Sequence, residues 1–157
     1  MQNKINSLKL RMKDNNVDLV VLGPGTHMNW LLGFNPYPDE RPCMLLIGKE
    51  KEAFLMPSVN AEDAKKRTDI AINSWKDENG PDQALKEALL YIGESSAKHI
   101  AIDEAMRSHF ALIVIEALPN PTYEFTASTI GALRMRKDQT EFINLKENAL
   151  IDDRAMQ

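Results

Sequence analysis

The stretch VDLVVLGPGTHMNWLLGF, residues 17 to 34, decides the fold. It begins with a short apolar run rich in valine and closes with GPG at residues 23 to 25, which predicts a buried strand followed by a tight turn. Residues 26 to 34 then have the pattern of a short helix that ends at Gly33. A buried strand that leads through a turn into a helix is typical of an α/β domain.

The segments on either side of this stretch follow the same alternation. Ile5, Leu8 and Met12 recur at helical spacing and predict a helix before the strand. After it, CMLLIG at residues 43 to 48 and EAFLM at residues 52 to 56 flank a short turn, which predicts an antiparallel hairpin. Because a hairpin interrupts strict strand-helix alternation, the expected sheet is mixed.

The rest of the chain adds further strands and helices to this pattern. Helices are predicted over residues 59–67, 81–93 and 106–118, the last of them buried. Strands are predicted over residues 70–75, 99–103 and 122–128. The expected fold is therefore an α/β domain with a mixed sheet of about six strands flanked by helices.

The chain closes with RMRKDQTEFINLKENALIDDRAMQ, residues 134 to 157, which reads like the beginning of another helix. Asp138 and Glu141 have the spacing of a capping box. The apolar residues that follow at helical spacing, called here the apolar stripe, are Phe142, Leu145, Ala149 and Met156.

We expect residues 138 to 157 to form a helix whose apolar stripe is covered by protein. The cover is expected to be either the α/β body or, preferentially, a second copy of the chain, because exposed apolar side chains forgo burial free energy. We place the domain boundary after residue 133, so that residues 1–133 form the α/β domain and residues 134–157 form a linker and a helix.

Composition and charge exclude several classes of protein. The formal net charge is -4 and the basic residues are scattered, so the chain lacks the basic stripe that nucleic-acid backbones require. The longest apolar run, residues 110–115, is far too short to cross a membrane. The single Cys43 excludes an internal disulfide and fits a reducing compartment. A cytoplasmic protein without membrane or nucleic-acid partners is expected.

Motifs that would identify an enzyme are missing, since the sequence contains no P-loop, GxGxxG, HExxH, GxSxG or CxxC. His99 and His109 fit packing or solvation better than metal ligation. His27 follows the first strand, where ligands often bind, so binding and packing both stay open for it. The proline-rich loop at residues 34–42 is either functional or simply solvated.

Two segments resemble the N-terminal domain of the creatinase/prolidase family. The first resembles the pattern N-x-x-Y-L-T-G-F, which Asn29, Leu31, Gly33 and Phe34 match, with Trp30 one place from the usual aromatic and Leu32 in place of Thr. The second, residues 132–153, resembles the family's linker R-x-x-K-s-x-x-E, and its matching residues are Arg134, Lys137, Glu141 and Ala149.

The resemblance implies a ribonuclease H-like fold and a parent that is a metal-dependent Xaa-Pro dipeptidase or aminopeptidase. In the family, two divalent metal ions, Mn or Co, are held by two Asp, one His and two Glu in a catalytic domain that these 157 residues do not contain. The chain by itself is therefore expected to hold no metal and to catalyse nothing. An amidinohydrolase such as creatinase is an alternative parent, and a stand-alone peptidase-like interaction module is an alternative role.

The resemblance also implies a homodimer in which this domain roofs the partner subunit's active site and contacts a small peptide substrate. It assigns substrate binding to His27, Trp30 and Arg41, with Tyr37 as an addition. The Arg41 guanidinium suits a peptide carboxylate, although a salt bridge to an adjacent acidic residue, Asp39 or Glu40, stays open. If the first two strands are antiparallel, His27 and Arg41 are expected on the same rim of the sheet.

Overall fold

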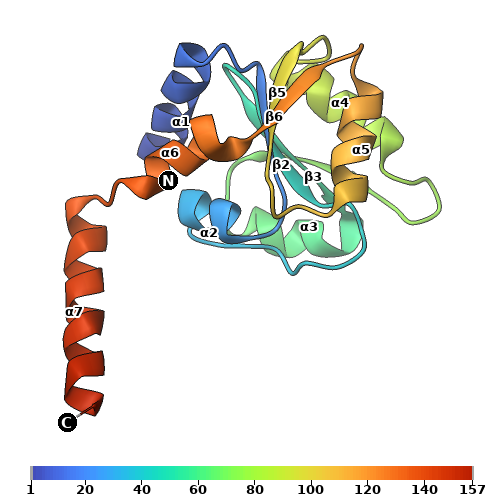
Figure 1. Cartoon of the computed structure of the whole chain (residues 1–157). Coiled ribbons are helices and arrows are strands. Elements are labelled where there is room, and N and C mark those ends of the chain that lie inside the picture. Colours follow the sequence, from blue (N-terminus) through green and yellow to red (C-terminus); the bar gives the residue numbers. More distant parts are fainter. Residues whose placement is uncertain (1, 157) are drawn as a thin grey trace.

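Within residues 2–156, which this computed structural model describes, six strands form one mixed sheet in the order β4-β3-β2-β1-β5-β6 (Figure 1). The strands are β1 (Leu19–Leu22), β2 (Met44–Ile47), β3 (Glu52–Pro57), β4 (Ala71–Trp75), β5 (His99–Ile102) and β6 (Thr122–Phe125). The expected α/β class with a mixed six-stranded sheet is confirmed.

Strand pairing brings the loops that follow five of the six strands to the same end of the sheet. β1 lies in the interior of the sheet, antiparallel to β2 and parallel to β5, with Val20 opposite Ile47 on one side and Ala101 on the other. β3 runs antiparallel to β2, whereas β4 is parallel to β3 and β6 is parallel to β5. We call the end where β1, β3, β4, β5 and β6 finish and β2 begins the carboxyl end of the sheet.

Helices cover both faces of the sheet (Figure 1). They are α1 (Gln2–Asp14), α2 (Thr26–Leu32), α3 (Ser58–Lys65), α4 (Asp82–Ile92), α5 (Ser108–Ala117), α6 (Ile130–Met135) and α7 (Gln139–Ala155). One apolar cluster packs α1, α2, α3 and α6 against one face, and a second packs α4 and α5 against the other. Cys43 is buried in the first cluster, and burial raises the pKa of its thiol to about 12.

Two expectations for single elements were wrong. The helix expected to be buried, α5, buries only Phe110 and Val114, while Leu112 is 54% exposed, because only one side of α5 faces the sheet. The sixth strand ends at Phe125 instead of residue 128, since the chain turns into a 3-10 segment at Thr126–Ser128. The short helix α6 was not expected at all; it is held by burial of Ile130.

The last helix, α7, forms with the predicted cap but leaves the body of the molecule (Figure 1). The Asp138 carboxylate accepts from the Glu141 backbone N–H at 2.8 Å, and the Glu141 carboxylate accepts from the Asp138 N–H at 3.2 Å. No described residue of α7 is buried, so packing of the apolar stripe on the body is contradicted, and cover by a second copy stays a prediction. Gln157 lies outside the described residues.

The apolar side chains of α7 do not form a single stripe. Successive residues of a helix are about 100° apart, so Ile143 and Leu150 lie well to one side of Phe142 and Leu145, and all four side chains are roughly half exposed. Across residues 2–156, no helix is both long enough and apolar enough to span a membrane.

Candidate functional site

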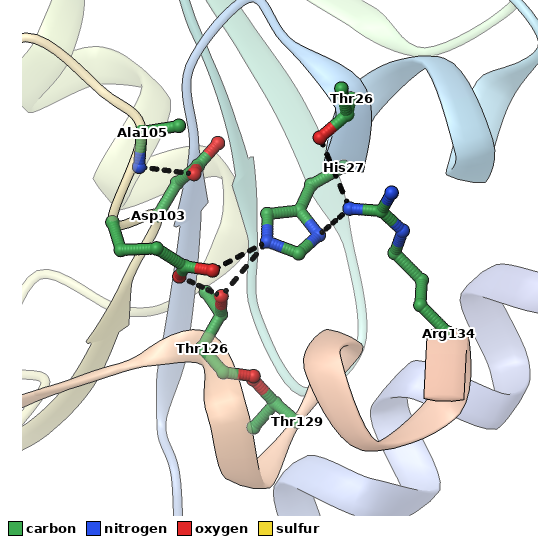
Figure 2. Close-up of polar contacts among 8 residues, drawn as sticks. Thr26, His27, Asp103, Ala105, Thr126, Thr129 and Arg134 are labelled. Atoms are coloured by element: carbon green, nitrogen blue, oxygen red, sulfur yellow. Dashed lines mark hydrogen bonds and ion pairs between the residues drawn. The ribbon is translucent and has the colours of Figure 1, made fainter. Parts of the chain in front are cut away.

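The candidate site lies at the carboxyl end of the sheet, where the neighbouring strands β1, β5 and β6 finish. His27 stands in the first turn of α2, just beyond β1. Glu104 follows β5, and Thr126 follows β6. Arg134 reaches His27 from α6, so four separate elements meet around one imidazole (Figure 2).

Hydrogen bonds hold His27 in one tautomer. Arg134 Nη1 lies 2.8 Å from His27 Nδ1, and an arginine only donates, so Nδ1 is the acceptor. His27 Nε2 therefore carries the proton and points it at Glu104 Oε1, 3.1 Å away, with Thr126 Oγ1 at 3.3 Å. Because Nδ1 accepts a hydrogen bond, the imidazole in this arrangement is neutral. At 6% exposed, it is a buried bridge between the Arg134 cation and the Glu104 carboxylate (Figure 2).

The two carboxylates after β5 have opposite pKa shifts. Burial acts to raise the pKa of Glu104, but the hydrogen bonds from Thr126 (2.6 Å) and His27 outweigh it and lower the pKa to about 2. Burial raises the pKa of Asp103 above its ordinary value, and the hydrogen bond from the Ala105 N–H only partly offsets this effect. Glu104 is therefore the charged partner of the network.

A metal ion fits this cluster poorly, although ligand atoms of His27, Asp103 and Glu104 lie within 4.8 Å of one another. A neutral imidazole has one lone pair to offer a metal, and here the Arg134 guanidinium occupies it. The positive charge of Arg134 would also repel a cation. We therefore interpret the cluster as a hydrogen-bond network.

Trp30, one turn further along α2, joins the body to the start of α7. Its indole N–H donates to Glu141 Oε1 at 2.6 Å. Lys4 Nζ lies 3.3 Å from the same oxygen and 4.2 Å from the centre of the indole ring. Glu141 therefore closes the capping box of α7 and at the same time ties that helix to α1 and α2.

His27 and Trp30 line one cavity of about 500 Å³ between α2, α6 and α7. Arg134 and Lys137 also line it, together with side chains of the first turns of α7. The structure thus brings together two of the four residues that the family resemblance suggested.

Arg41 and Tyr37 lie elsewhere. The guanidinium of Arg41 binds Asp77 through two hydrogen bonds, from Nε at 3.0 Å and from Nη2 at 3.1 Å, and lies 3.7 Å from Asp39. The hydrogen bond with Asp77 raises the pKa of Arg41. Tyr37 is 80% exposed beside a separate cavity of about 210 Å³ that α3 helps to form.

His27 and Arg41 share the carboxyl end of the sheet, as expected, because β1 and β2 are antiparallel. Within residues 2–156 no hydrogen bond or ion pair joins them, and their partners differ. The salt-bridge alternative for Arg41 is realised with Asp39 and also with Asp77, which sequence reasoning did not anticipate.

Sequence reasoning also missed Glu104 and Thr126 as partners of His27. Glu104 follows the strand predicted over residues 99–103, and Thr126 lies near the end of the strand predicted over residues 122–128. A position at the end of a strand is the available signal for a site residue. That signal was insufficient because it does not show which strands are neighbours in the sheet.

Comparison with known proteins identifies the family. The sequence model of the Creatinase/Prolidase N-terminal domain matches residues 4–136. A comparison with curated proteins finds no significant match.

Solved structures share the fold at low sequence identity. A dipeptidase from Pyrococcus horikoshii OT3 is 24% identical, with a TM-score of 0.76 over 87% of this chain and 38% of its own. A recombinant prolidase from Thermococcus sibiricus is 19% identical, with a TM-score of 0.82 over 99% of this chain and 42% of its own. The creatinase/prolidase N-terminal domain of an X-Pro dipeptidase from Streptococcus pyogenes is 16% identical, with a TM-score of 0.71 over 80% of this chain and 94% of its own.

This chain therefore spans about two fifths of the length of the archaeal enzymes and most of the streptococcal domain. Because the family model accounts for most of the sequence and the solved structures repeat the fold, the chain belongs to the creatinase/prolidase N-terminal domain family.

Proposed function

We propose that this chain acts as the non-catalytic N-terminal domain of a metal-dependent Xaa-Pro dipeptidase or aminopeptidase. In this role it contributes to a homodimer and roofs the active site of the partner subunit, where it limits substrate size. The observation that carries the proposal is the open cavity at the carboxyl end of the sheet, where His27 and Trp30 lie beside the start of α7.

Three features support this role. The family match covers residues 4–136, and similar solved structures carry the names dipeptidase and prolidase. Trp30 supplies an aromatic group to the cavity, and the buried His27 holds the Arg134 guanidinium beside it, a combination that suits contact with a small peptide. Exposed apolar side chains on several faces of α7 favour a further protein surface around that helix.

The metal chemistry belongs to another part of the parent in this proposal. Two divalent ions, Mn or Co, would be held in a catalytic domain and would activate the attacking water there. The one His-containing acidic cluster of residues 2–156 does not fit a metal, since Arg134 occupies the lone pair of His27. The contribution of this chain is limited to binding, orientation and exclusion of larger substrates, in a protein that we place in the cytoplasm.

A domain exchange tests the proposal. Residues 1–157 of this chain would replace the matching N-terminal part of the Thermococcus sibiricus prolidase, which aligns with 99% of this chain. We expect the chimera to dimerise and to hydrolyse Ala-Pro with Mn²⁺. His27→Ala and Trp30→Ala are expected to raise KM with little change in kcat, because a roof acts on binding.

The matched control in the chimera is Arg41→Gln, whose guanidinium is already occupied by Asp77, and we expect a smaller effect from it. A chimera that folds, dimerises and keeps its KM in both the His27 and the Trp30 variants would contradict the roofing role.

The exposed faces of α7 also favour the second candidate, a stand-alone interaction module. The reading frame beyond residue 157 discriminates between the two: two Asp, one His and two Glu at ligand spacing support the peptidase, and a stop supports the module. The residues of the substrate pocket in that frame would separate a peptidase from a creatinase-type amidinohydrolase.

The chain alone is expected to show no turnover of Xaa-Pro dipeptides with added Mn²⁺, and turnover that survives repurification would contradict this expectation.

A further inference from the structure

The basic run RMRK, residues 134 to 137, divides its charges between two sides of the linker. Arg134 and Lys137 line the cavity of about 500 Å³ between α2, α6 and α7. Arg136 lines a different cavity, toward α1. Two cations of the linker therefore face one concave site while the third faces away from it.

Both cations contact only neutral acceptors. Arg134 Nη1 donates to Thr26 Oγ1 at 3.1 Å and to His27 Nδ1, while Lys137 Nζ donates to the backbone oxygen of Arg134 at 2.8 Å. None of the salt bridges formed among residues 2–156 includes Arg134 or Lys137. No carboxylate of the described chain therefore contacts either cation directly, and Glu104 reaches Arg134 only through His27.

The one carboxylate on the cavity lining does not neutralise them. Glu141 is bound by the Trp30 indole, by Lys4 and by the Asp138 N–H. Lys4 compensates its charge from the α1 side. Arg134 and Lys137 thus lack a directly bound counter-charge, and the Nε and Nη2 groups of Arg134 have no partner within residues 2–156.

The remaining walls suit an organic anion better than an inorganic one. Trp30, Met135 and Leu145 supply apolar surface, and Asn144 and Asn148, one turn apart on α7, supply amide groups. The volume is within the range of small-molecule sites. A guanidinium fork and an ammonium group bind carboxylates strongly, and amides pair with peptide groups.

We propose that this cavity binds a small carboxylate with an apolar body, such as the C-terminal residue of a short peptide, and that Arg134 and Lys137 hold the carboxylate. The inference rests on the proposed function for the source of that ligand, a peptide substrate or product. It assigns to Arg134 the carboxylate-binding role that the family resemblance implied for Arg41, whose guanidinium is already bound by Asp77.

Binding to the full chain tests the inference. N-acetyl-L-leucine and N-acetyl-L-leucinamide differ only in the carboxylate, and inorganic phosphate supplies an anion without an apolar body. Calorimetric and NMR titrations are expected to show that the acid binds at least about tenfold more tightly than either the amide or phosphate. The acid should shift the Trp30 indole N–H resonance and the backbone resonances of residues 134–148.

Matched variants locate the charge. Arg134→Gln is expected to weaken binding of the acid about tenfold, and Lys137→Gln several-fold. Arg136→Gln removes the same charge from the other side of the linker and should leave binding unchanged, as should Arg41→Gln. If Arg134→Gln disturbs α6, Lys137→Gln still decides the question, because Lys137 contacts only a backbone oxygen.

Equal binding of acid and amide, equal binding of acid and phosphate, or equal losses in the Lys137 and Arg136 variants would each overturn the inference. Failure of these titrations with a chimera that still hydrolyses Ala-Pro would reject the carboxylate site and leave the proposed function in place. Binding of the acid together with a chimera that folds but does not hydrolyse Ala-Pro would support the carboxylate site and reject the proposed function.

Discussion

Helices α4 and α7 show opposite relations between local signals and packing. α4 has no side-chain cap at its start, yet it buries the five residues Ala84, Leu85, Ala88, Leu89 and Ile92 against the sheet. α7 has a complete capping box, yet none of its described residues is buried. The cap determines where a helix begins, whereas burial depends on what lies beside it.

The difference shows where the stability of each helix originates. Isolated helices of this length are marginal in water, and packing supplies most helical stability in proteins. α4 obtains that packing within this chain. α7 is tied to the body through Glu141 and buries none of its residues, so packing within the described residues adds little to its stability.

The largest effect expected from this contrast is on the mass of the protein in solution, which reports its oligomeric state. If a second copy covers α7, sedimentation of the full chain should give twice the monomer mass, and a chain ending at Arg136 should be a monomer. Phe142→Asp should also give a monomer, because it places a charge on the apolar surface. Leu90→Asp, on the exposed side of α4, is the matched control and should change nothing.

Monomers for both the full and the shortened chain, together with rapid amide exchange over residues 138–156, would contradict association through α7.

The next effect is on the free energy of unfolding. Leu89→Ala removes a fully packed side chain of α4 and should lower it by about 2–5 kcal/mol. Leu150→Ala on α7, measured where the chain is monomeric, should change it by less than about 0.5 kcal/mol, because that side chain is half exposed. Urea unfolding followed by circular dichroism measures both, and similar losses would show that α7 packs in solution.

A smaller effect is expected from the cap itself. Asp138→Ala removes the acceptor of the Glu141 N–H. It should lower the free energy of local opening of α7 by about 0.5–2 kcal/mol, seen as faster amide exchange in the first turns of the helix. Asp138→Asn keeps an acceptor and should stay close to the parent chain. The body should exchange as before in both variants; equal exchange in the Ala and Asn variants would refute a role for the cap.

The smallest effect concerns pH. The folded-state pKa of Glu104, about 2, lies below its ordinary 4.5, so its stabilising contribution is complete above pH 4.5 and is lost as the pH falls toward 2. Its side chain is half exposed, which limits the contribution to about 1 kcal/mol or less. Glu104→Gln should therefore flatten the fall in urea midpoint between pH 5 and 2.

Two comparisons sharpen this test. Asp103 acts with the opposite sign, because a raised pKa favours the folded state as that group becomes protonated. Glu147→Gln, an exposed change on α7, is the control and should keep the parent's acid profile. An acid profile of Glu104→Gln identical to that of the parent chain would show that its hydrogen bonds to Thr126 and His27 carry no pH-dependent stability.

Much of the fold was predictable because it rests on near neighbours in sequence. Helical spacing in α1 and α4, the strand-turn-strand pattern of β2 and β3, and the left-handed Gly33 that ends α2 all involve residues a few positions apart. The capping box of α7 spans only three residues. Such local interactions depend little on the rest of the fold, so sequence patterns predict them well.

The site was less predictable because its contacts span long sequence separations. His27 is bound by residues 77, 99 and 107 positions away, and Arg41 by a residue 36 positions away. Sequence position indicated that His27 follows a strand and that Arg41 precedes one. It did not indicate that β5 and β6 lie on one side of β1 while the β4 end lies on the other.

By itself, then, the sequence determined most of the elements, the hairpin that makes the sheet mixed, the cap of α7 and the family resemblance, because each depends on side chains that are close along the chain. Tertiary structure alone decided that His27 is a neutral bridge, that Arg41 is occupied by Asp77, and that Arg134 and Lys137 face a cavity. Those outcomes depend on strand order and on which charges meet in space, and Coulomb and hydrogen-bond energies act over ångströms regardless of separation along the chain.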